Sequence, residues 1–458
     1  MTDAMIDRRT SENSYLAGNF APLPDEVTAF DLPVVQGQLP PELSGRYLRI
    51  GPNPVAAEAE GYHWFTGTGM VHGIRLDGGR AEWYRSRFVR AGGILEQQGW
   101  DDPGGPAGVM QGAVNTNVIG LAGRTFACVE AGSNPIELSD ELETIGRADF
   151  SGPATAGIPG PFSAHPKRDP DTGDLHVVAY YWGWDTVQYQ VIGADGVVKH
   201  TADIAVPGKP MMHDLSITET HVILYDLPVT FDLDMAMTGA GLPYRWDEDY
   251  GARVGVLPKG GTADQVKWYD VEPCYVFHPM NAHDLDDGRI VLDIVRHPSM
   301  FRTDMRGPNE GNPTLDRWTI DPAAGRVTEE RLDDHPLEFP RIDERLVGKR
   351  ARYGYAGTFD GTSGGLQFGP LMRWDSTTGT RILHDYGPNR LSMEAVFIPR
   401  TPDSAEDDGW VMSVTYDVAE DTSHLVLLNG QDFAGEPACT IALPNRVPYG
   451  FHGNWVAD

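Results

Sequence analysis

Cysteine is scarce in this chain of 458 residues, which contains three. Cys128, Cys274 and Cys439 lie at irregular spacings in strand-like segments, and no CxxC motif occurs. An odd number of cysteines without metal-ligand spacing argues against a disulfide framework and against a cysteine zinc site. We therefore expect a reducing compartment, the cytoplasm.

Long apolar segments are also absent. No apolar run reaches the about 18 residues that a membrane-spanning helix needs, and residues 1–20 are polar, without the apolar core of a signal peptide. We expect residues 1–14 to be a disordered N-terminal segment. Because no linker-like tract interrupts the rest, we expect residues 15–458 to form a single domain.

Basic residues are few relative to acidic ones. The chain has 36 Lys and Arg against 66 Asp and Glu, a formal net charge of −30. An excess of negative charge repels phosphate backbones and anionic lipid headgroups. This argues against nucleic-acid binding and allows weak membrane contact at most, while nothing in the sequence specifies an oligomeric state.

Helical periodicity is rare, and short strand-like segments dominate. Val, Ile, Tyr and Trp are concentrated in residues 124–131, 174–184, 221–231, 288–297, 409–417 and 424–430. Turn sequences such as DPDTGD, DPAAG and DSTTG separate them. Short helices are predicted only near Phe231–Gly239 and Ala107–Asn115.

Many short strands without a linker favour a closed all-β architecture, since closure protects strand edges. A seven-bladed β-propeller, with a cap of loops and short helices, fits best, and a pair of β-sandwich domains is the alternative. Seven blades would contain about 65 residues each. No clean WD40 or kelch repeat occurs.

Four of the 14 histidines lie beside apolar residues near strand ends: His165, His213, His278 and His452. A histidine in a dry environment needs a hydrogen-bond partner or a metal. Four ligands so far apart along the chain would come from different blades and could meet on the axis. Imidazole ligands suit Fe, Cu, Zn or Ni, and the spacing does not choose among them.

Three glutamates, Glu130, Glu338 and Glu394, lie in apolar strand-like surroundings. Each could accept a hydrogen bond from a metal-bound histidine and so orient its ring. Alternatively, each could form a buried ion pair with an arginine, for example Arg341 or Arg400. The residues alone support both interpretations equally.

At these residues the chain resembles the carotenoid cleavage oxygenase family, which includes apocarotenoid oxygenases and lignostilbene dioxygenases. Matching segments extend from Tyr15 to about Trp455 and include YLAGNFAPLPDEV, LPPELSGRYLRIGPNP, AHPKRDPDTGDL, MMHDLSIT, FHPMNAHD, EAVFIPR and FHGNW. Several long matches in the family order make a chance similarity improbable.

The resemblance implies a seven-bladed propeller with one Fe(II) on its axis. The family's four iron-binding histidines match His165, His213, His278 and His452, and its three outer glutamates match Glu130, Glu338 and Glu394. The family splits a C=C double bond with O₂ into two carbonyl products. Thr116 matches the residue that in some members limits access to an open iron position.

Departures from the family pattern concern the substrate. The common FDGDGM is FTGTGM here (Phe65–Met70), which is either a loop change or an altered entrance. His283 and Asp284 replace an aromatic residue and Glu, yet His278, which follows an aromatic residue, is the expected ligand. Val129 stands where lignostilbene-type members have a Lys that polarises a phenolic hydroxyl.

These features predict a non-haem Fe(II) dioxygenase that cleaves an apolar polyene, a carotenoid or apocarotenoid. A phenolic stilbene or phenylpropene is the alternative substrate, and a binding propeller without chemistry is the non-enzymatic alternative. The predicted partners are a small hydrophobic substrate and O₂. The predicted walls of an apolar tunnel are Trp64, Phe65, Phe162, Phe277 and Phe451, each of which could instead be plain core packing.

Overall fold

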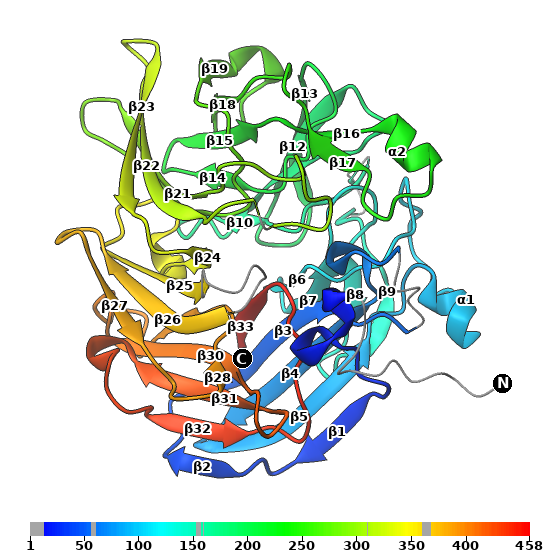
Figure 1. The fold of residues 1–458 in the computed structure, drawn as a ribbon, viewed down its shortest axis with the longest axis vertical. Helices are drawn as coiled ribbons and strands as arrows, with labels where there is room; N and C mark the ends of the chain where they lie inside the picture. The colour runs from blue at the N-terminus through cyan, green and yellow to red at the C-terminus, as the bar shows by residue number, and fades with distance from the viewer. Residues whose placement is uncertain (1–12, 56–60, 153–156, 159, 309, 360–367) are drawn as a thin grey trace.

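Seven antiparallel sheets follow one another in chain order around a central axis, as the colour sequence of Figure 1 shows. The computed structural model describes residues 13–458 except 56–60, 153–156, 159, 309 and 360–367. Residues 1–12 of the N-terminal segment expected to be disordered lie outside this part of the chain. The seven sheets confirm the predicted β-propeller.

The first three blades contain these strands. Blade 1 has the order β1 (Val27–Phe30), β5 (Arg80–Phe88), β4 (Gly69–Asp77), β3 (Gly45–Pro52) and β33 (Gly453–Ala457). Blade 2 has β6 (Asn117–Leu121), β7 (Arg124–Cys128), β8 (Ile136–Leu138) and β9 (Thr144–Arg147). Blade 3 has β10 (Lys167–Arg168), β11 (Leu175–Ala179), β12 (Thr186–Ile192) and β13 (Val198–Ala205).

The other four blades continue the same arrangement. Blade 4 has β14 (Leu215–Ile217), β15 (His221–Asp226), β18 (Arg253–Pro258) and β19 (Lys267–Asp270). Blade 5 has β20 (Pro279–Asp284), β21 (Ile290–Arg296), β22 (Thr314–Asp321) and β23 (Arg326–Asp333). Blade 6 has β24 (Leu337–Arg341), β25 (Tyr353–Phe359), β26 (Phe368–Asp375) and β27 (Thr380–His384). Blade 7 has β28 (Arg390–Leu391), β29 (Val396–Pro399), β30 (Gly409–Asp417), β31 (Thr422–Asn429), β32 (Cys439–Ala442) and β2 (Val34–Gly37).

Both ends of the chain close the ring. The C-terminal strand β33 pairs with β3 in blade 1, where Tyr47 faces Trp455. The N-terminal strand β2 pairs with β32 in blade 7, where Val34 faces Ile441. Because the ends complete two neighbouring blades, strand pairing between distant parts of the chain closes the ring.

Burial differs between the inside and the outside of a blade. Strand β3 is buried along its whole length, whereas the outer strands β13 and β23 alternate between more and less exposed residues. An inner strand has a sheet against each face, while an outer strand has one face in solvent. The middle strand β11, which reads LHVVA, is likewise buried along its whole length.

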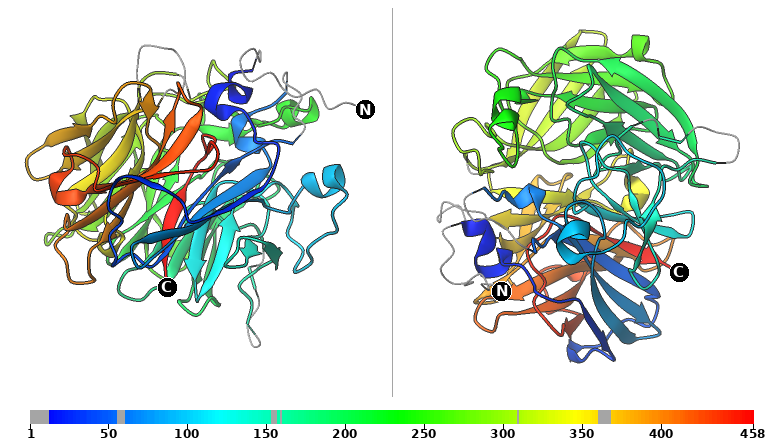
Figure 2. Two further views of the ribbon diagram at one scale, coloured as in Figure 1. Left: turned by 90° about the horizontal axis from the view of Figure 1, so that it is seen from below. Right: turned by 90° about the vertical axis from the view of Figure 1, so that its right-hand side faces the viewer.

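Helices are short. Within the described residues they are α1 (Ile94–Gln98), α2 (Leu233–Met237) and the 3-10 helices η1 (Ser14–Leu16), η2 (Gly18–Phe20), η3 (Trp64–Thr66), η4 (Ala263–Gln265), η5 (Glu344–Leu346) and η6 (Gly430–Asp432). Helix α2 lies inside the range predicted for it, with Asp232 as its N-cap. A ribbon of β16 (Val229–Phe231) and β17 (Tyr244–Trp246) flanks it. The N-terminal helices and α2 lie on the face opposite the C terminus (Figure 2, left).

The helix predicted at Ala107–Asn115 is wrong. This segment is an irregular loop, in which the N–H of Met110 donates to the carbonyl of Gly132 and that of Gly112 to Ser133 Oγ. Gly108 and Gly112 lower the helix propensity of the segment, and bonds to a neighbouring loop replace the helical ones. No helix in the described part of the chain has the length and apolarity that crossing a bilayer requires.

Candidate metal centre

The first strands of successive blades surround the axis, and polar side chains stand at their starts. Among the contacts between these strands are those of β33 with β6, β10 with β14, and β14 with β20. Following the chain, the residues at or just before these starts are Thr116, His165, His213, His278, Glu338, Glu394 and His452. One such residue from each of the seven blades explains how positions so distant in sequence converge.

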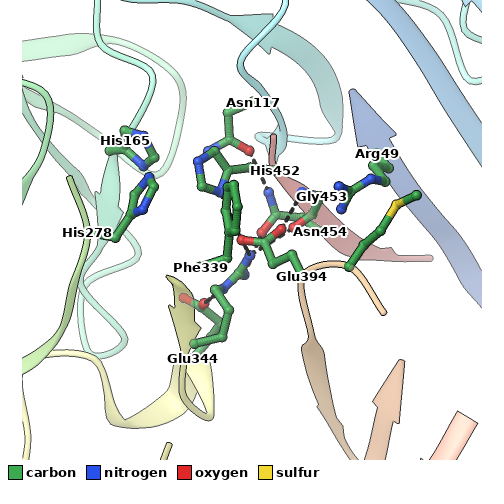
Figure 3. Close-up of polar contacts among 12 residues, drawn as sticks. Arg49, Asn117, His165, His278, Phe339, Glu344, Glu394, His452, Gly453 and Asn454 are labelled. Carbon is green, nitrogen blue, oxygen red and sulfur yellow. Dashed lines mark hydrogen bonds and ion pairs between the residues drawn. The ribbon is translucent and has the colours of Figure 1, made fainter. Parts of the chain in front are cut away.

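The four predicted histidines form one buried cluster. Their ligand nitrogens lie within 4.8 Å of one another. The Nε2 atom of His213 lies 2.9 Å from that of His165 and 3.3 Å from that of His278. Figure 3 shows the rings of His165 and His278 on one side of His452. His283 is not part of the cluster, and it lies on β20 opposite Val291.

Three of the four rings donate a hydrogen bond outward to a glutamate. Nδ1 of His213 lies 2.8 and 2.7 Å from the two oxygens of Glu130. Nδ1 of His278 lies 2.6 Å from Glu338, and Nδ1 of His452 lies 2.8 Å from Glu394. Because a carboxylate only accepts, each Nδ1 carries the proton. In the neutral ring, Nε2 then presents its lone pair to the centre.

The donor set fits a divalent metal ion. Facing lone pairs repel one another unless a cation lies between them. Two nitrogens bound at a right angle to one ion, each at about 2.1 Å, are about 3.0 Å apart, close to the spacings here. Burial, with the neighbouring rings, lowers the pKa of His165 well below its usual value. Burial lowers the pKa of His452 to about 3 despite Glu394, so both rings are neutral at pH 7.

Glu394 satisfies both interpretations that the sequence left open. Besides His452, it contacts Arg341 Nη1 at 3.1 Å. It also accepts the backbone N–H of Gly453 at 2.7 Å (Figure 3). Burial alone would raise its pKa, but Arg341 and His452 lower it to about 2. One divalent cation together with Arg341 would balance the three carboxylates. Arg400, the other arginine considered, pairs with Asp408 and Glu42 instead.

A β-bulge aims Glu338 and Phe339 at His278. The pairing of β24 with β25 shifts register between Glu338 and Arg341, and Phe339 has a φ of +54°. The N–H of Phe339 donates to Glu338 Oε2 at 2.6 Å, and its ring stacks on His278 at 5.2 Å and 28°. Bulges near sites often redirect side chains in this way. His278 is therefore held at Nδ1 and on one ring face.

His165 has a different environment from the other three rings. Its Nδ1 lies 3.7 Å from Asp214 Oδ2, which is too long for a hydrogen bond. Asp214 instead accepts from Lys167 Nζ at 2.8 Å and from the N–H of Leu215 at 2.6 Å. This ion pair was not predicted, although Asp214 directly follows His213 and Lys167 is two residues after His165, in HDL and HPK.

An apolar cavity of about 550 Å³ opens onto one side of the cluster. His213, His278 and His452 contribute to its wall, as do the predicted access residues Phe65, Thr116 and Val129. The predicted wall residues Trp64, Phe277 and Phe451 also line it. Phe162 does not: it packs against Phe150 in a core between blades, so that prediction is wrong.

Sequence reasoning missed an aromatic row in the cavity wall. Trp182 stacks on Phe231, Phe231 contacts Tyr244, and Tyr244 contacts Tyr180. Tyr180 ends the row beside Glu130, and burial together with that carboxylate raises its pKa well above the usual value. The segment YYWGW was the available signal, but its composition was interpreted as that of a strand.

A smaller polar cavity of about 90 Å³ lies on the other side of the cluster. Its wall includes His165, Asp214, Lys167, Arg341 and Asn117. The cluster therefore separates a mainly apolar space from a polar one. An apolar ligand would therefore approach the centre from the side of the larger cavity.

Comparisons with known proteins give one consistent family. Residues 20–457 match the family model described as retinal pigment epithelial membrane protein. A carotenoid cleavage oxygenase of Mycobacterium tuberculosis is 44% identical and covers 97% of this chain and 98% of its own.

Two solved structures share the fold. The lignostilbene dioxygenase of Pseudomonas brassicacearum superimposes with a TM-score of 0.88 and 28% identity, over 98% of this chain and 100% of its own. A variant of the Synechocystis apocarotenoid oxygenase gives a TM-score of 0.83 and 29% identity, over 95% and 97% of the two chains.

Proposed function

Since the chain belongs to the carotenoid cleavage oxygenase family, we propose that residues 15–458 act as one Fe(II) dioxygenase domain in the cytoplasm. Its substrate is an apolar polyene, a carotenoid or apocarotenoid, whose C=C bond is split by O₂ into two carbonyls. One observation carries the proposal: four buried imidazoles, three of them bonded outward to a glutamate, meet at the end of an apolar cavity.

One ferrous ion per chain would be held by His165, His213, His278 and His452. Iron is favoured over zinc because oxygenase chemistry needs a redox-active metal, which zinc is not. When bound, iron supplies the binding and activation of O₂. Glu130, Glu338 and Glu394 fix the rings of three ligands and offset the charge of the ion.

Protein side chains then bind and orient the substrate. The aromatic wall, with Phe65, holds the polyene chain and excludes water from the centre. Thr116, whose hydroxyl donates to Asn115 Oδ1 at 2.9 Å, narrows the approach from the cavity. At the mouth, Leu233 and Met237 are 61% and 79% exposed and line the cavity, which suits weak contact with lipid or a micelle.

Val129 favours the polyene over a phenolic stilbene. It lies in the cavity wall next to Glu130, and its aliphatic side chain cannot polarise a phenolic hydroxyl. The fold similarity to a lignostilbene dioxygenase keeps the stilbene as the second substrate class to test.

The experiment is product analysis by mass spectrometry with a panel of apocarotenals and 4-hydroxystilbenes, together with iron analysis. We expect one iron per chain and two carbonyl products from an apocarotenal. His213→Ala should bind no iron, and its turnover should be at least 100-fold slower. His283→Ala, five residues after His278 in the same motif but outside the cluster, is the matched control and should keep both.

Three results would count against the proposal. Iron-free active protein, or full activity of H213A, would remove the metal site from the mechanism. Faster turnover of a hydroxystilbene than of any apocarotenal would assign the other substrate class. Absence of any bound metal and any turnover would favour a binding propeller.

A further inference from the structure

His297 lies one step farther from the centre than the glutamates. It directly follows β21 and is 3% exposed. Its backbone exchanges two hydrogen bonds with Tyr275, of 2.8 and 2.9 Å. Its ring stands perpendicular to that of Phe277, with centroids 5.4 Å apart. The backbone and the ring plane of His297 are therefore both fixed without help from any hydrogen bond of the ring nitrogens.

The imidazole of His297 completes the hydrogen bonding of Glu338. Nε2 of His297 lies 2.6 Å from Oε1, while Oε2 accepts from Nδ1 of His278 and from the N–H of Phe339. Because the carboxylate only accepts, Nε2 of His297 is a donor. Both oxygens of Glu338 are thereby engaged by three donors.

Glu338 differs from Glu394 in what supports it. Glu394 has the guanidinium of Arg341, which is fixed in turn by Glu344 and Asn454. Among the described residues, the ion pairs of Glu338 are with His278 and His297 and none is with a lysine or arginine. His297 occupies the supporting position that Arg341 has at the other glutamate.

The chain His278–Glu338–His297 also joins two blades. His278 and His297 come from the β20–β21 hairpin, where the N–H of Val295 donates to the carbonyl of His278 at 3.1 Å. Glu338 comes from β24 of the next blade. Without the donor on His297, Oε1 would be a buried acceptor with no partner, and the carboxylate could rotate away from His278.

We propose that His297 is a positioning residue that acts through Glu338 to fix the ring orientation and tautomer of His278. This inference rests on the proposed metal site. Removing an outer hydrogen-bond partner of a metal ligand typically weakens metal binding by about 10–100-fold. Since His297 acts through Glu338 and not directly on His278, we expect removal of its donor to weaken metal binding by about tenfold, near the lower end of that range.

The test is binding of Co²⁺ to the metal-free protein, followed by competition with a chelator and by the visible spectrum of the bound ion. His297→Phe fills the space but cannot donate, and it should weaken cobalt binding about tenfold and change the visible bands. His297→Asn, whose shorter amide does not reach Glu338, should behave in the same way if H297F fails to fold. His297→Gln places an amide donor near the position of Nε2 and should restore most of the affinity and the spectrum.

A matched control separates positioning from general destabilisation. His384, at the end of β27 in blade 6, is also buried, but its Nδ1 donates to the carbonyl of Phe433, away from the centre. His384→Phe should leave cobalt affinity and spectrum unchanged even if it lowers the melting temperature.

Two outcomes have different meanings. If folded H297F and H297N bind cobalt as tightly as the wild type and with the same spectrum, His297 has no positioning role. If instead His278→Ala binds cobalt like the wild type, the proposed metal site itself fails, whatever His297 does.

Discussion

At the scale of single residues, buried histidines in this protein differ in their partners. Those of the cluster face carboxylates or one another, whereas His72 faces the hydroxyl of Tyr84, 2.8 Å from its Nδ1. Burial, with Arg49 and Arg446 nearby, lowers the pKa of His72 to about 3. This ring is therefore neutral in the folded protein at any pH at which the protein is used.

The depressed pKa of His72 predicts acid sensitivity. Below the ordinary pKa of about 6.5, the unfolded chain binds a proton at this position and the folded protein does not. The neutral His72 ring therefore makes its full contribution to the free energy of unfolding above that pH. This contribution is lost as the pH falls toward 3, by about 1.4 kcal/mol per pH unit. In urea unfolding of the metal-free protein between pH 6 and 4, His72→Gln should flatten the pH dependence by about that amount. Equal slopes for both proteins would contradict the assignment.

The sequence predicted which residues carry charge at the centre better than it predicted their partners. The predicted partner of Glu394 was either a histidine or an arginine, and Glu394 contacts both His452 and Arg341. His297 gave no signal, because VRHPS reads as an ordinary strand end and its partner lies in another blade. Contacts between blades depend on how the sheets pack, which local sequence does not encode.

At the scale of elements, the inner strand starts do the positioning, and β24 shows how a bulge contributes. Phe339 adopts a φ of +54°, a region that costs an L-residue about 1 kcal/mol or more. The conformation persists because the N–H bonds Glu338 and the ring stacks on His278 and packs near His452 at 5.3 Å.

Two substitutions separate the backbone and ring contributions of Phe339. Both Phe339→Ala and Phe339→Gly remove the ring and should destabilise the protein by about 3–5 kcal/mol. Glycine accepts a positive φ without strain, so F339G should be more stable than F339A by about 0.5–1 kcal/mol, the reverse of the usual order. Urea unfolding of the metal-free variants measures both quantities. A more stable F339A would show that the left-handed conformation is not retained.

Strands and helices were predictable where turn sequences mark their ends. Every strand-rich segment predicted from composition contains a strand, for example β15 in 221–231 and β30 at 409–417. The helix near 231–239 begins at Leu233, where the side chain of Asp232 caps it. The missing helix at 107–115 and the unpredicted α1 both lie in connections, where bonds to neighbouring loops outweigh weak local propensity.

At the scale of the whole molecule, the four histidines belong to blades 1, 3, 4 and 5, and the other three blades contribute Thr116, Glu338 and Glu394. The ring is closed by two strand pairings, β33 with β3 and β2 with β32. A central ion would add a third connection, because it binds blades 1, 3, 4 and 5 at once. Unfolding any of these blades would then release the ion.

Metal removal should therefore lower the stability of the entire propeller. A ligand present at 100 times its Kd stabilises the folded state by about 2.7 kcal/mol. For a chain longer than 250 residues, this corresponds to a change in Tm of about 3–6 °C. Differential scanning calorimetry with and without a chelator would measure the change. H213A, which should bind no metal, should melt at the same temperature in both conditions, and a wild type that does likewise would argue against an ion that connects the blades.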